Sequence, residues 1–383
     1  MRNVFLLVLF LIIASSAVYI FIGRDFINNT QEAVVAPPPI LDTKTGDSQN
    51  PDSSLSTVLA EGLDTPWAIA FLPDRSILLT ERPGRLRKID SSGKLNPLPI
   101  PGMPKVNEIG EGGLLGITLH PQFTSNNYLY LYYTYSGSGD ATLNRVSRLT
   151  YQNNQLLSEV IIIDQIPGAG NHNGGRIKFG PDGFLYITTG DAGEPSQAQN
   201  KDNLAGKILR VTDLGQAAAG NPFNNLVYSL GHRNPQGIAW DSSGNLWQTE
   251  HGRSSPTGFD EVNLIKAGNN YGWPEFEGDK KADGMIPPVR HSGATNTWAP
   301  AGADFIGNSL FYGGLKGQTL YEVVLKDNKI AEFKEHFKGE YGRIREVITG
   351  PDGMLYITTS NQDGRGSPAS ADDRIIRIDT KKL

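Results

Sequence analysis

The sequence predicts an all-β fold, a six-bladed β-propeller of four-stranded antiparallel blades. Two observations carry this prediction. With 44 glycines and 24 prolines among 383 residues, turns must be frequent and long helices few. In addition, one pattern recurs from residue 66 onwards: a short apolar strand, a turn, an alternating strand that ends in a polar residue, and a further strand.

The chain begins with residues 4–23, an uncharged and mostly apolar stretch long enough to cross a bilayer as a helix. Apolar residues continue beyond Ala14–Ala17, a segment of small residues that resembles a signal cleavage site. We therefore expect residues 1–24 to form a signal anchor, with a cleaved signal peptide as the alternative. We expect either segment to export the rest of the chain to the periplasmic or extracellular face, and an uncleaved anchor would hold it on the cytoplasmic membrane.

A linker is expected between this segment and the folded domain. Residues 25–54 are rich in Pro, Asn, Asp, Ser and Thr and lack apolar periodicity. Such a composition cannot bury enough apolar surface to fold, so the linker should be flexible. The propeller domain then spans residues 55–383.

The repeated unit occurs six times in this domain. Its copies lie at 66–81, 113–134, 174–191, 234–252, 302–325 and 344–361, and the copy at 302–325 is the weakest. Each is followed by a segment of mixed charge, or in the copy at 302–325 ends in one, that we expect to form an edge strand; these segments lie at 84–90, 146–152, 206–212, 260–266, 319–325 and 373–379. A four-stranded sheet of this size cannot bury its faces alone, so the six units should pack radially.

Smaller features complete the predicted ring. Residues 56–60 should pair with 373–379 and so close it. A threonine recurs near the end of the second strand, at Thr80, Thr134, Thr189, Thr249 and Thr358. Pro-Asp-Gly at 181–183 and 351–353 predicts tight turns. Most of the five tryptophans should pack between blades; they are Trp67, Trp240, Trp247, Trp273 and Trp298.

Composition excludes several classes of function. The net charge is −5 with acidic and basic residues interspersed, so the basic stripe that a nucleic acid needs is missing from the sequence. The chain has no cysteine, which rules out disulfides, thiolate metal sites and thiol nucleophiles.

His172 is the candidate for proton transfer. It stands in the Gly- and Asn-rich loop 171–176 before the first strand of the third blade, where it should face the central channel. A neutral imidazole is the commonest general base, although a lone histidine is more often structural.

Arg343 and Arg345 alternate around Ile344, so both side chains should point to the same side of an extended segment. Two guanidinium groups on one side suit a ligand with several carboxylates. Salt bridges to Glu340 or Glu346 are the alternative.

Other charged residues extend this candidate site. Arg233 also precedes a first strand, and Lys316 lies in a glycine-rich turn that lets a ligand approach the backbone closely. Asp260, Glu261 and the loop 268–273 offer hard oxygen ligands of the kind that calcium takes, although their spacing alone is a weak signal.

Several segments together resemble the soluble quinoprotein glucose/sorbosone dehydrogenase family, in particular its aldose sugar dehydrogenase branch. They are GLLGITLHP (113–121), NHNGGRIKFGPDG (171–183), LGHRNPQG (230–237), QTEHG (248–252), DEVNLI (260–265), NNYGWP (269–274) and REVITGPDG (345–353). The resemblance covers about residues 56–380. It implies a six-bladed propeller that holds pyrroloquinoline quinone (PQQ) and calcium over the channel mouth and oxidises aldoses at C1 to lactones.

The resemblance also implies roles for single residues. His172 matches the catalytic base, and Arg343 would lie near the reacting quinone oxygens, where positive charge stabilises a developing anion. The positions that hold or face the cofactor are Glu111, Arg233, Asn234, His251, Lys316, Arg343 and Arg345. The carbonyls of Gly252 and Arg253 match the ligands of the cofactor's calcium, and Glu261 with the carbonyl of Tyr271 matches a second, structural calcium site.

Two positions depart from the family pattern. Glu111 stands where the family commonly has Gln, and a carboxylate there would repel an anionic ligand unless it is protonated or paired. Asn171 stands where the glucose dehydrogenase branch has Asp, so an acid that orients His172 is missing at that position.

We therefore expect an aldose dehydrogenase that passes electrons to an unknown acceptor, contacts the membrane through its N-terminal helix and is a monomer or weak dimer. Two alternatives stay open: a non-catalytic propeller that binds carbohydrate or protein, and a calcium-dependent lactonase. The lactonase would need an acidic metal cluster at the channel in place of the arginines and lysine.

Overall fold

The computed structural model describes residues 54–253, 258–327 and 329–383. The predicted signal anchor at 1–24 and all but the last residue of the predicted linker lie outside the described residues. Within the described ranges, no helix combines the length and the hydrophobicity needed to cross a membrane.

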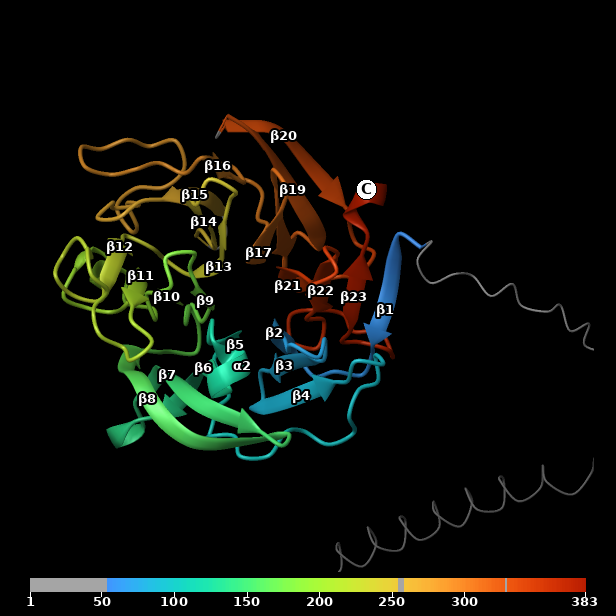
Figure 1. The fold of residues 1–383 in the computed structure, drawn as a ribbon. Coiled ribbons are helices and arrows are strands. Elements are labelled where there is room, and N and C mark those ends of the chain that lie inside the picture. Colours follow the sequence, from blue (N-terminus) through green and yellow to red (C-terminus); the bar gives the residue numbers. More distant parts are fainter. Residues whose placement is uncertain (1–53, 254–257, 328) are drawn as a thin grey trace, which may run out of the picture. The chain divides into compact units, whose positions relative to one another are not determined.

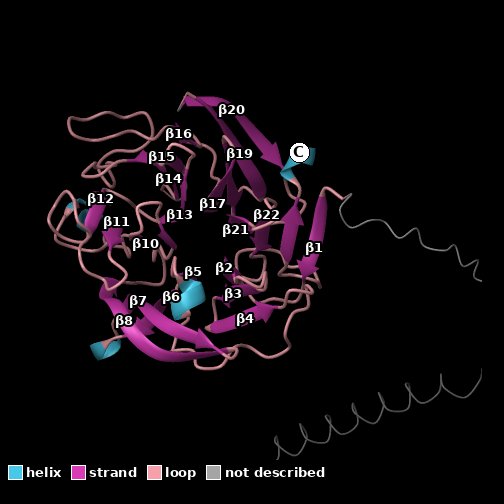
Figure 2. Ribbon diagram, viewed as in Figure 1, coloured by secondary structure: helices cyan, strands magenta, loops and turns pink. Residues whose placement is uncertain are grey.

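The described residues form six antiparallel sheets arranged around a central channel (Figure 1), which confirms the predicted six-bladed propeller. Helices in this part of the chain are short turns, as Figure 2 shows. They are α2 (Phe123–Asn126), η2 (Ser138–Asp140), η3 (Pro195–Gln199) and η4 (Thr380–Lys382).

Each blade runs outwards from the channel. The innermost strands are β2 (Pro66–Phe71), β5 (Leu114–Leu119), β9 (Ile177–Phe179), β13 (Pro235–Trp240), β17 (Pro300–Ile306) and β21 (Ile344–Thr349). The second strands are β3 (Ile77–Glu81), β6 (Tyr128–Ser136), β10 (Leu185–Thr189), β14 (Leu246–Glu250), β18 (Ser309–Gly314) and β22 (Leu355–Thr359). The third strands are β4 (Arg85–Ile89), β7 (Thr142–Gln152), β11 (Lys207–Val211), β15 (Glu261–Ile265), β19 (Thr319–Lys326) and β23 (Ile375–Ile378). The outermost strands are β1 (Ser56–Ala60), β8 (Gln155–Pro167), β12 (Val227–Leu230), β16 (Arg290–His291) and β20 (Lys329–His336).

The mixed-charge segments are third strands, and the prediction that they form edges is wrong for all but β4. Their charges have partners inside the blade. Arg210 on β11 donates to Asp182 at 2.9 Å, and Arg377 on β23 donates to Asp352 at 2.7 Å. Both acceptors belong to the Pro-Asp-Gly turns, so an arginine in the third strand binds the turn instead of marking a solvent-facing edge.

The first blade departs from the four-stranded prediction. Its sheet, as far as the described residues show, has the three strands β2, β3 and β4, and a single bridge between Ile89 and Leu95 stands in for a fourth strand.

Strand β1 closes the ring as predicted. It pairs antiparallel with β23, with Thr57 opposite Arg377, so the last blade contains strands from both ends of the domain. Ile375 of this blade packs in one buried cluster with Ile69 and Leu79 of the first blade. Closure of this kind removes the free edge that an open ring would expose.

Three of the five recurrent threonines, Thr80, Thr249 and Thr358, join neighbouring blades. Thr80 donates to the carbonyl of Leu115 at 2.6 Å, and Thr249 donates to the carbonyl of Ala301 at 2.7 Å. Each acceptor lies on the innermost strand of the next blade. Thr134 instead donates to Asn144 of its own blade. In the third blade Thr188, one position before the Thr189 that the repeat spacing selects, accepts the N–H of Arg176, as Thr80 accepts the N–H of Ala68.

Two of the five tryptophans pack between blades, whereas most of the five were expected to do so. The rings of Trp240 and Tyr186 are 5.1 Å apart, and those of Trp247 and Phe305 are 6.3 Å apart. Trp67 instead lies inside the channel, where the guanidinium carbon of Arg176 stands 4.3 Å from its ring centre. The other two do not join this set: Trp298 packs against aromatic rings of its own blade, and Trp273 lies beside the site described below.

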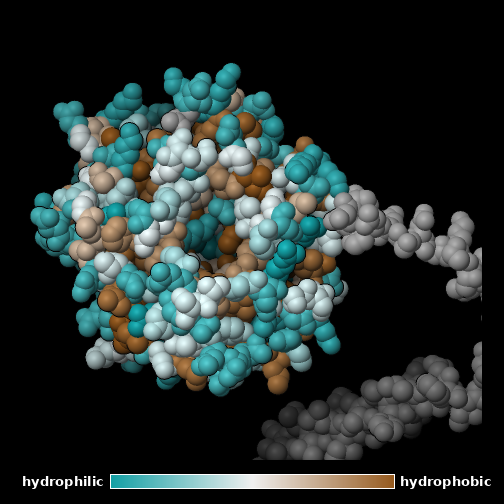
Figure 3. Space-filling model, in the orientation of Figure 1, coloured by the Kyte–Doolittle hydropathy of each residue, from teal (hydrophilic) through white to brown (hydrophobic). Residues whose placement is uncertain are grey.

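A buried ion pair divides the channel. Arg176, immediately before β9, pairs with Glu346 on β21, and both side chains are almost fully buried. Glu346 was the predicted alternative partner of Arg343 or Arg345, and the structure gives it to Arg176 instead. A cavity lies on each side of this layer, and the two share no lining residue among those described. Figure 3 shows the hollow at the centre of one face.

Candidate active site

The candidate site is a cavity of about 420 Å³ at one end of the channel. Most of its walls come from loops that lead into the first strand of a blade or leave the second strand. The charged side chains that line it, among the described residues, are Arg233, Arg253, Lys316, Arg343, Arg345 and Arg365, against the acids Glu111 and Asp260. Six cations against two acids make this cavity positive in a chain whose net charge is −5.

His172 lines the cavity as predicted and is held by a buried carboxylate. Its Nδ1 lies 2.7 Å from Oδ1 of Asp191, which is fully buried, while 13% of the histidine side chain is exposed. The acid that is missing at Asn171 is therefore supplied by Asp191, which follows β10. Since Nδ1 is bound to Asp191, Nε2 is the ring nitrogen left to accept a proton.

Asp191 stays ionised in this position. Burial opposes its charge, but the hydrogen bond and the charge of His172, together with the donors Gly193 and Trp273, lower its pKa below the ordinary value. An ionised carboxylate at Nδ1 fixes the imidazole orientation and stabilises the imidazolium that proton uptake creates.

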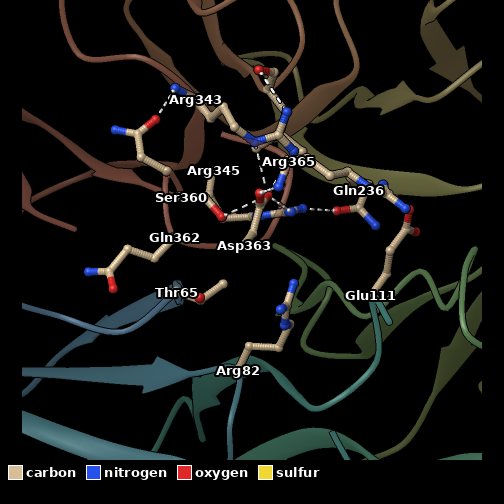
Figure 4. Close-up of polar contacts among 12 residues, drawn as sticks. Thr65, Arg82, Glu111, Gln236, Arg343, Arg345, Ser360, Gln362, Asp363 and Arg365 are labelled. Atoms are coloured by element: carbon tan, nitrogen blue, oxygen red, sulfur yellow. Dashed lines mark hydrogen bonds and ion pairs between the residues drawn. The ribbon is translucent and has the colours of Figure 1, made fainter. Parts of the chain in front are cut away.

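Arg343 and Arg345 both reach the cavity, as their alternation predicts. Figure 4 shows them beside Asp363, which accepts from Nε and Nη2 of Arg343 at 2.9 and 2.7 Å. The predicted alternative partner Glu340 is thus replaced by an acid from the loop after β22.

Arg345 has fewer partners than its donors require. Its Nη1 donates to Gln236 at 2.8 Å, but its buried Nε finds no acceptor among the described residues. Burial lowers the pKa of Arg345 to about 9, and the nearby Arg343 adds to this effect. An anion in the cavity would supply the missing acceptor and stabilise both charges.

The lining of the cavity includes three more predicted cofactor residues, Arg233, His251 and Lys316, but not Asn234. Arg233 and His251 are part of the cavity wall, and Lys316 is exposed at its rim. Burial lowers the pKa of His251 to about 4, so its ring is neutral at neutral pH. Asn234 is fully buried outside the described lining, and its Oδ1 accepts the N–H of Gly174 at 3.0 Å. Asn234 therefore positions the loop that carries His172.

Glu111 is paired, and pairing is what allows a carboxylate to stand beside an anionic ligand at this position. Its carboxylate accepts from Arg365 and from the backbone N–H of His172, the latter at 3.1 Å. Burial would raise the pKa of Glu111, but the charges of His251 and Arg365 and these hydrogen bonds lower it to about 2. Since His251 is neutral above pH 4, Arg365 is the lasting partner at neutral pH.

The predicted metal ligands lie in two places. Gly252 and Arg253 line the main cavity, and the α-carbon of Gly252 is so close to the carbonyls of Gly258 and Phe259 that a Cβ would stand 2.3 and 2.2 Å from their oxygens. Two backbone carbonyls therefore lie against Gly252, and backbone carbonyls are among the ligands that calcium takes.

Glu261 and Tyr271 line smaller cavities next to the main one, together with Glu277. Glu261 stands directly opposite Glu250 in the ladder of β14 and β15. Burial and the charge of Glu250 raise the pKa of Glu261 to about 8. A bound cation would offset this cost of ionisation. No three acidic or histidine side chains of the described residues gather to hold a metal by themselves, so carbonyls must complete both sites.

Three residues of the site do not follow from the sequence motifs alone. Asp191, Asp363 and Arg365 all come from segments that leave a second strand. Because the first two strands of a blade are antiparallel, such a segment returns to the channel end where the blade began. Asp191 ends the repeat copy 174–191, so this geometry could have identified it.

The fold and the site together define a β-propeller whose channel mouth carries six cationic side chains beside a histidine–aspartate pair. The chain belongs to the glucose/sorbosone dehydrogenase family, whose model matches residues 63–376.

Named relatives agree with this membership. Aldose sugar dehydrogenase YliI of Escherichia coli K12 is 35% identical over 340 residues, which cover 80% of this chain and 90% of the relative. Quinoprotein glucose dehydrogenase B of Acinetobacter calcoaceticus is 36% identical over 62% of this chain and 56% of the relative. The PQQ-bound structure of aldose sugar dehydrogenase from Streptomyces coelicolor aligns with a TM-score of 0.78 and 38% identity, over 85% of this chain and 97% of that one.

We predict that Glu111→Gln removes a stabilising contribution that depends on pH. The folded-state pKa of Glu111, about 2, lies below its ordinary value of 4.5. The contribution is therefore complete above pH 4.5 and is lost as the pH falls towards 2. Because Arg365 is largely exposed, we expect the wild type to be more stable than the variant by about 0.5 to 1 kcal/mol at pH 6 and by less at pH 3, measured by urea unfolding.

Arg365→Gln should reproduce this pattern, because it removes the other half of the pair. A difference between wild type and Glu111→Gln that is equal at the two pH values would contradict the assignment.

Proposed function

We propose that this protein oxidises aldose sugars at C1 to lactones, with PQQ and calcium as cofactors. The observation that supports this most is the His172–Asp191 pair, which opens onto a cavity lined by six cations. The named relatives support the same reaction class, since they include an aldose sugar dehydrogenase, a quinoprotein glucose dehydrogenase and a PQQ-bound structure.

The cavity suits a flat tricarboxylate such as PQQ. Arg233, Arg345 and Lys316 would hold its carboxylates, and the Nε atoms of Arg345 and His251 that lack partners among the described residues would bind its oxygens. When bound, PQQ supplies an acceptor for the hydride that leaves C1 of the sugar.

The protein's own side chains handle the proton and the developing charge. Nε2 of His172 takes the proton of the C1 hydroxyl, and Asp191 stabilises the imidazolium that results. Arg343, held in place by Asp363, stabilises negative charge that develops beside its guanidinium. Calcium at the carbonyls of Gly252 and Arg253 would act as a Lewis acid.

The charge of the cavity favours this reaction over a calcium-dependent lactonase. A lactonase needs several carboxylates around its metal. Here the acids that line the cavity, among the residues described, are Glu111 and Asp260, and both already bind donors: Glu111 accepts from Arg365, and Asp260 accepts from the N–H of Gly252 at 2.9 Å.

We also propose that the propeller faces the periplasm or the outside of the cell and is tethered by residues 4–23. The length of this apolar run supports the proposal. The tethered protein should appear in the membrane fraction and be digested by protease added to spheroplasts. Recovery in the cytoplasm would exclude export, and a mature N-terminus just after Ala17 would show a cleaved signal instead.

We predict that His172→Ala lowers kcat for glucose by about 10²- to 10⁴-fold, because the proton acceptor is lost. The full-length protein is loaded with PQQ and calcium, and sugar-driven reduction of a dye is followed. Binding of PQQ should stay within about twofold of wild type, because the arginines are unchanged. His336→Ala, on outer strand β20, is the control and should leave both quantities unchanged.

Two results would contradict the proposed reaction. Wild-type protein that binds PQQ but oxidises no aldose would be a binding propeller. Protein that neither binds PQQ nor reduces the dye would exclude a quinoprotein altogether.

We predict that Glu261→Gln weakens calcium binding by about tenfold or more, since it removes the only carboxylate charge that we assign to the second calcium site. Calorimetric titration of the apoprotein with calcium measures this directly, and the calcium-induced rise in Tm should shrink accordingly. Glu275→Gln, an exposed acid nearby, is the matched control. Equal affinities in wild type and Glu261→Gln would remove Glu261 from the metal site.

A further inference from the structure

Trp273 contacts the acid of the histidine–aspartate pair although it stands outside the cavity. Its indole Nε1 donates to Oδ2 of Asp191 at 2.8 Å, across 82 residues of sequence. The side chain is buried, and it does not belong to the described lining of the main cavity. Trp273 therefore reaches the reacting region through Asp191.

The two oxygens of Asp191 have different partners. Oδ1 lies 2.7 Å from Nδ1 of His172 and accepts the N–H of Gly193 at 2.9 Å, whereas Oδ2 accepts from Trp273. The carboxylate is fully buried, so an oxygen without a donor would be costly. Since an indole N–H can donate but not accept, Trp273 restrains the plane of the carboxylate and thereby the direction of the bond to His172.

The backbone of Trp273 is fixed on both sides, which makes this restraint stiff. Its N–H donates to the carbonyl of Gly231 at 3.0 Å, and its carbonyl accepts from Nε2 of Gln199 at 2.6 Å. The ring also lies against two cations of the cavity wall, with the guanidinium carbons of Arg233 and Arg253 at 5.3 and 4.8 Å from its centre. The ring face of Trp273 therefore contacts the two arginines, while its N–H binds Asp191.

We propose that Trp273 is a positioning residue for proton transfer: its indole N–H holds Asp191 so that Oδ1 faces His172. The inference rests on the proposed function in that His172 takes the proton of the sugar hydroxyl. Removal of the hydrogen-bond partners that orient metal ligands commonly changes activity by 10- to 100-fold, and we expect an effect of the same order for the partner that orients Asp191.

The test is Trp273→Phe, which keeps an aromatic face for the two arginines and removes the N–H. In the enzyme loaded with PQQ and calcium, kcat for glucose should fall about 10- to 100-fold, while KM and the affinity for PQQ stay within about threefold. The acidic limb of the kcat profile should move to higher pH by roughly 0.5 unit or more, because a carboxylate with one donor fewer stabilises the imidazolium more strongly. The other charged groups that face the pair are unchanged in the variant: Arg233 acts on Asp191, and Glu111 accepts the backbone N–H of His172. Glu111 in turn interacts with His251 and Arg365.

The chain offers a matched control. Trp247 is also fully buried, and its indole N–H donates to an aspartate, Asp241, at 2.9 Å in a turn of the fourth blade. Trp247→Phe removes the same kind of hydrogen bond away from the cavity. It should lower stability and leave kcat and its pH profile unchanged.

A second readout does not depend on turnover. The protein has six histidines, so ¹⁵N-labelling of histidine in the apoprotein gives few ring signals, and the one absent in His172→Gln belongs to His172. Trp273→Phe should shift or broaden its Nδ1–H signal, and Trp247→Phe should not. An unchanged signal with unchanged kcat, or equal kinetic effects of the two tryptophan variants, would overturn the inference. Wild type without aldose oxidation would overturn the proposed reaction instead, while the ring signal would still decide whether Trp273 positions Asp191.

Discussion

The antiparallel hairpin of the first two strands in each blade is the constraint on which the site depends. It returns the chain to the channel end where the blade began, so the residues before the first strand and after the second strand become neighbours. His172 meets Asp191 in this way, and Arg343 meets Asp363. The ring repeats this arrangement, and side chains that are distant in sequence meet around one axis.

Electrostatics then gives the cavity its character. Arg345 is desolvated and its neighbours satisfy only part of its hydrogen-bonding capacity: burial lowers its pKa to about 9, and its Nε lacks an acceptor among the described residues. Asp363 pairs with Arg343 and Glu111 pairs with Arg365, and these two carboxylates offset part of the positive charge of the cavity. The arrangement favours a ligand with several negative charges far more than a neutral one.

Much of this architecture can be predicted from the sequence, because repeated strands have a strong periodic signal. The six units, the closing strand at 56–60 and the convergence of His172 with Arg233 and Arg343 follow from that signal and from the family motifs. The order of strands within a blade was harder to predict. The arginines of β11 and β23 bind aspartates in hairpin turns, so charged residues in these strands do not mark an edge strand. Arg365 could not be found because a loop carries it to Glu111, 254 residues away, and composition does not fix the course of a loop.

Among the described residues, the layer formed by Trp67, Arg176 and Glu346 separates the cavity of the site from the second cavity of the channel, so the site opens at one end of the channel. In the proposed reaction, the sugar, the lactone and whatever molecule finally receives the electrons all have to pass this opening. Because they share this opening, we expect the lactone to leave before the electron acceptor enters. The kinetics of such an enzyme would be those of alternating half-reactions, and a molecule that stays bound at the opening would slow both half-reactions.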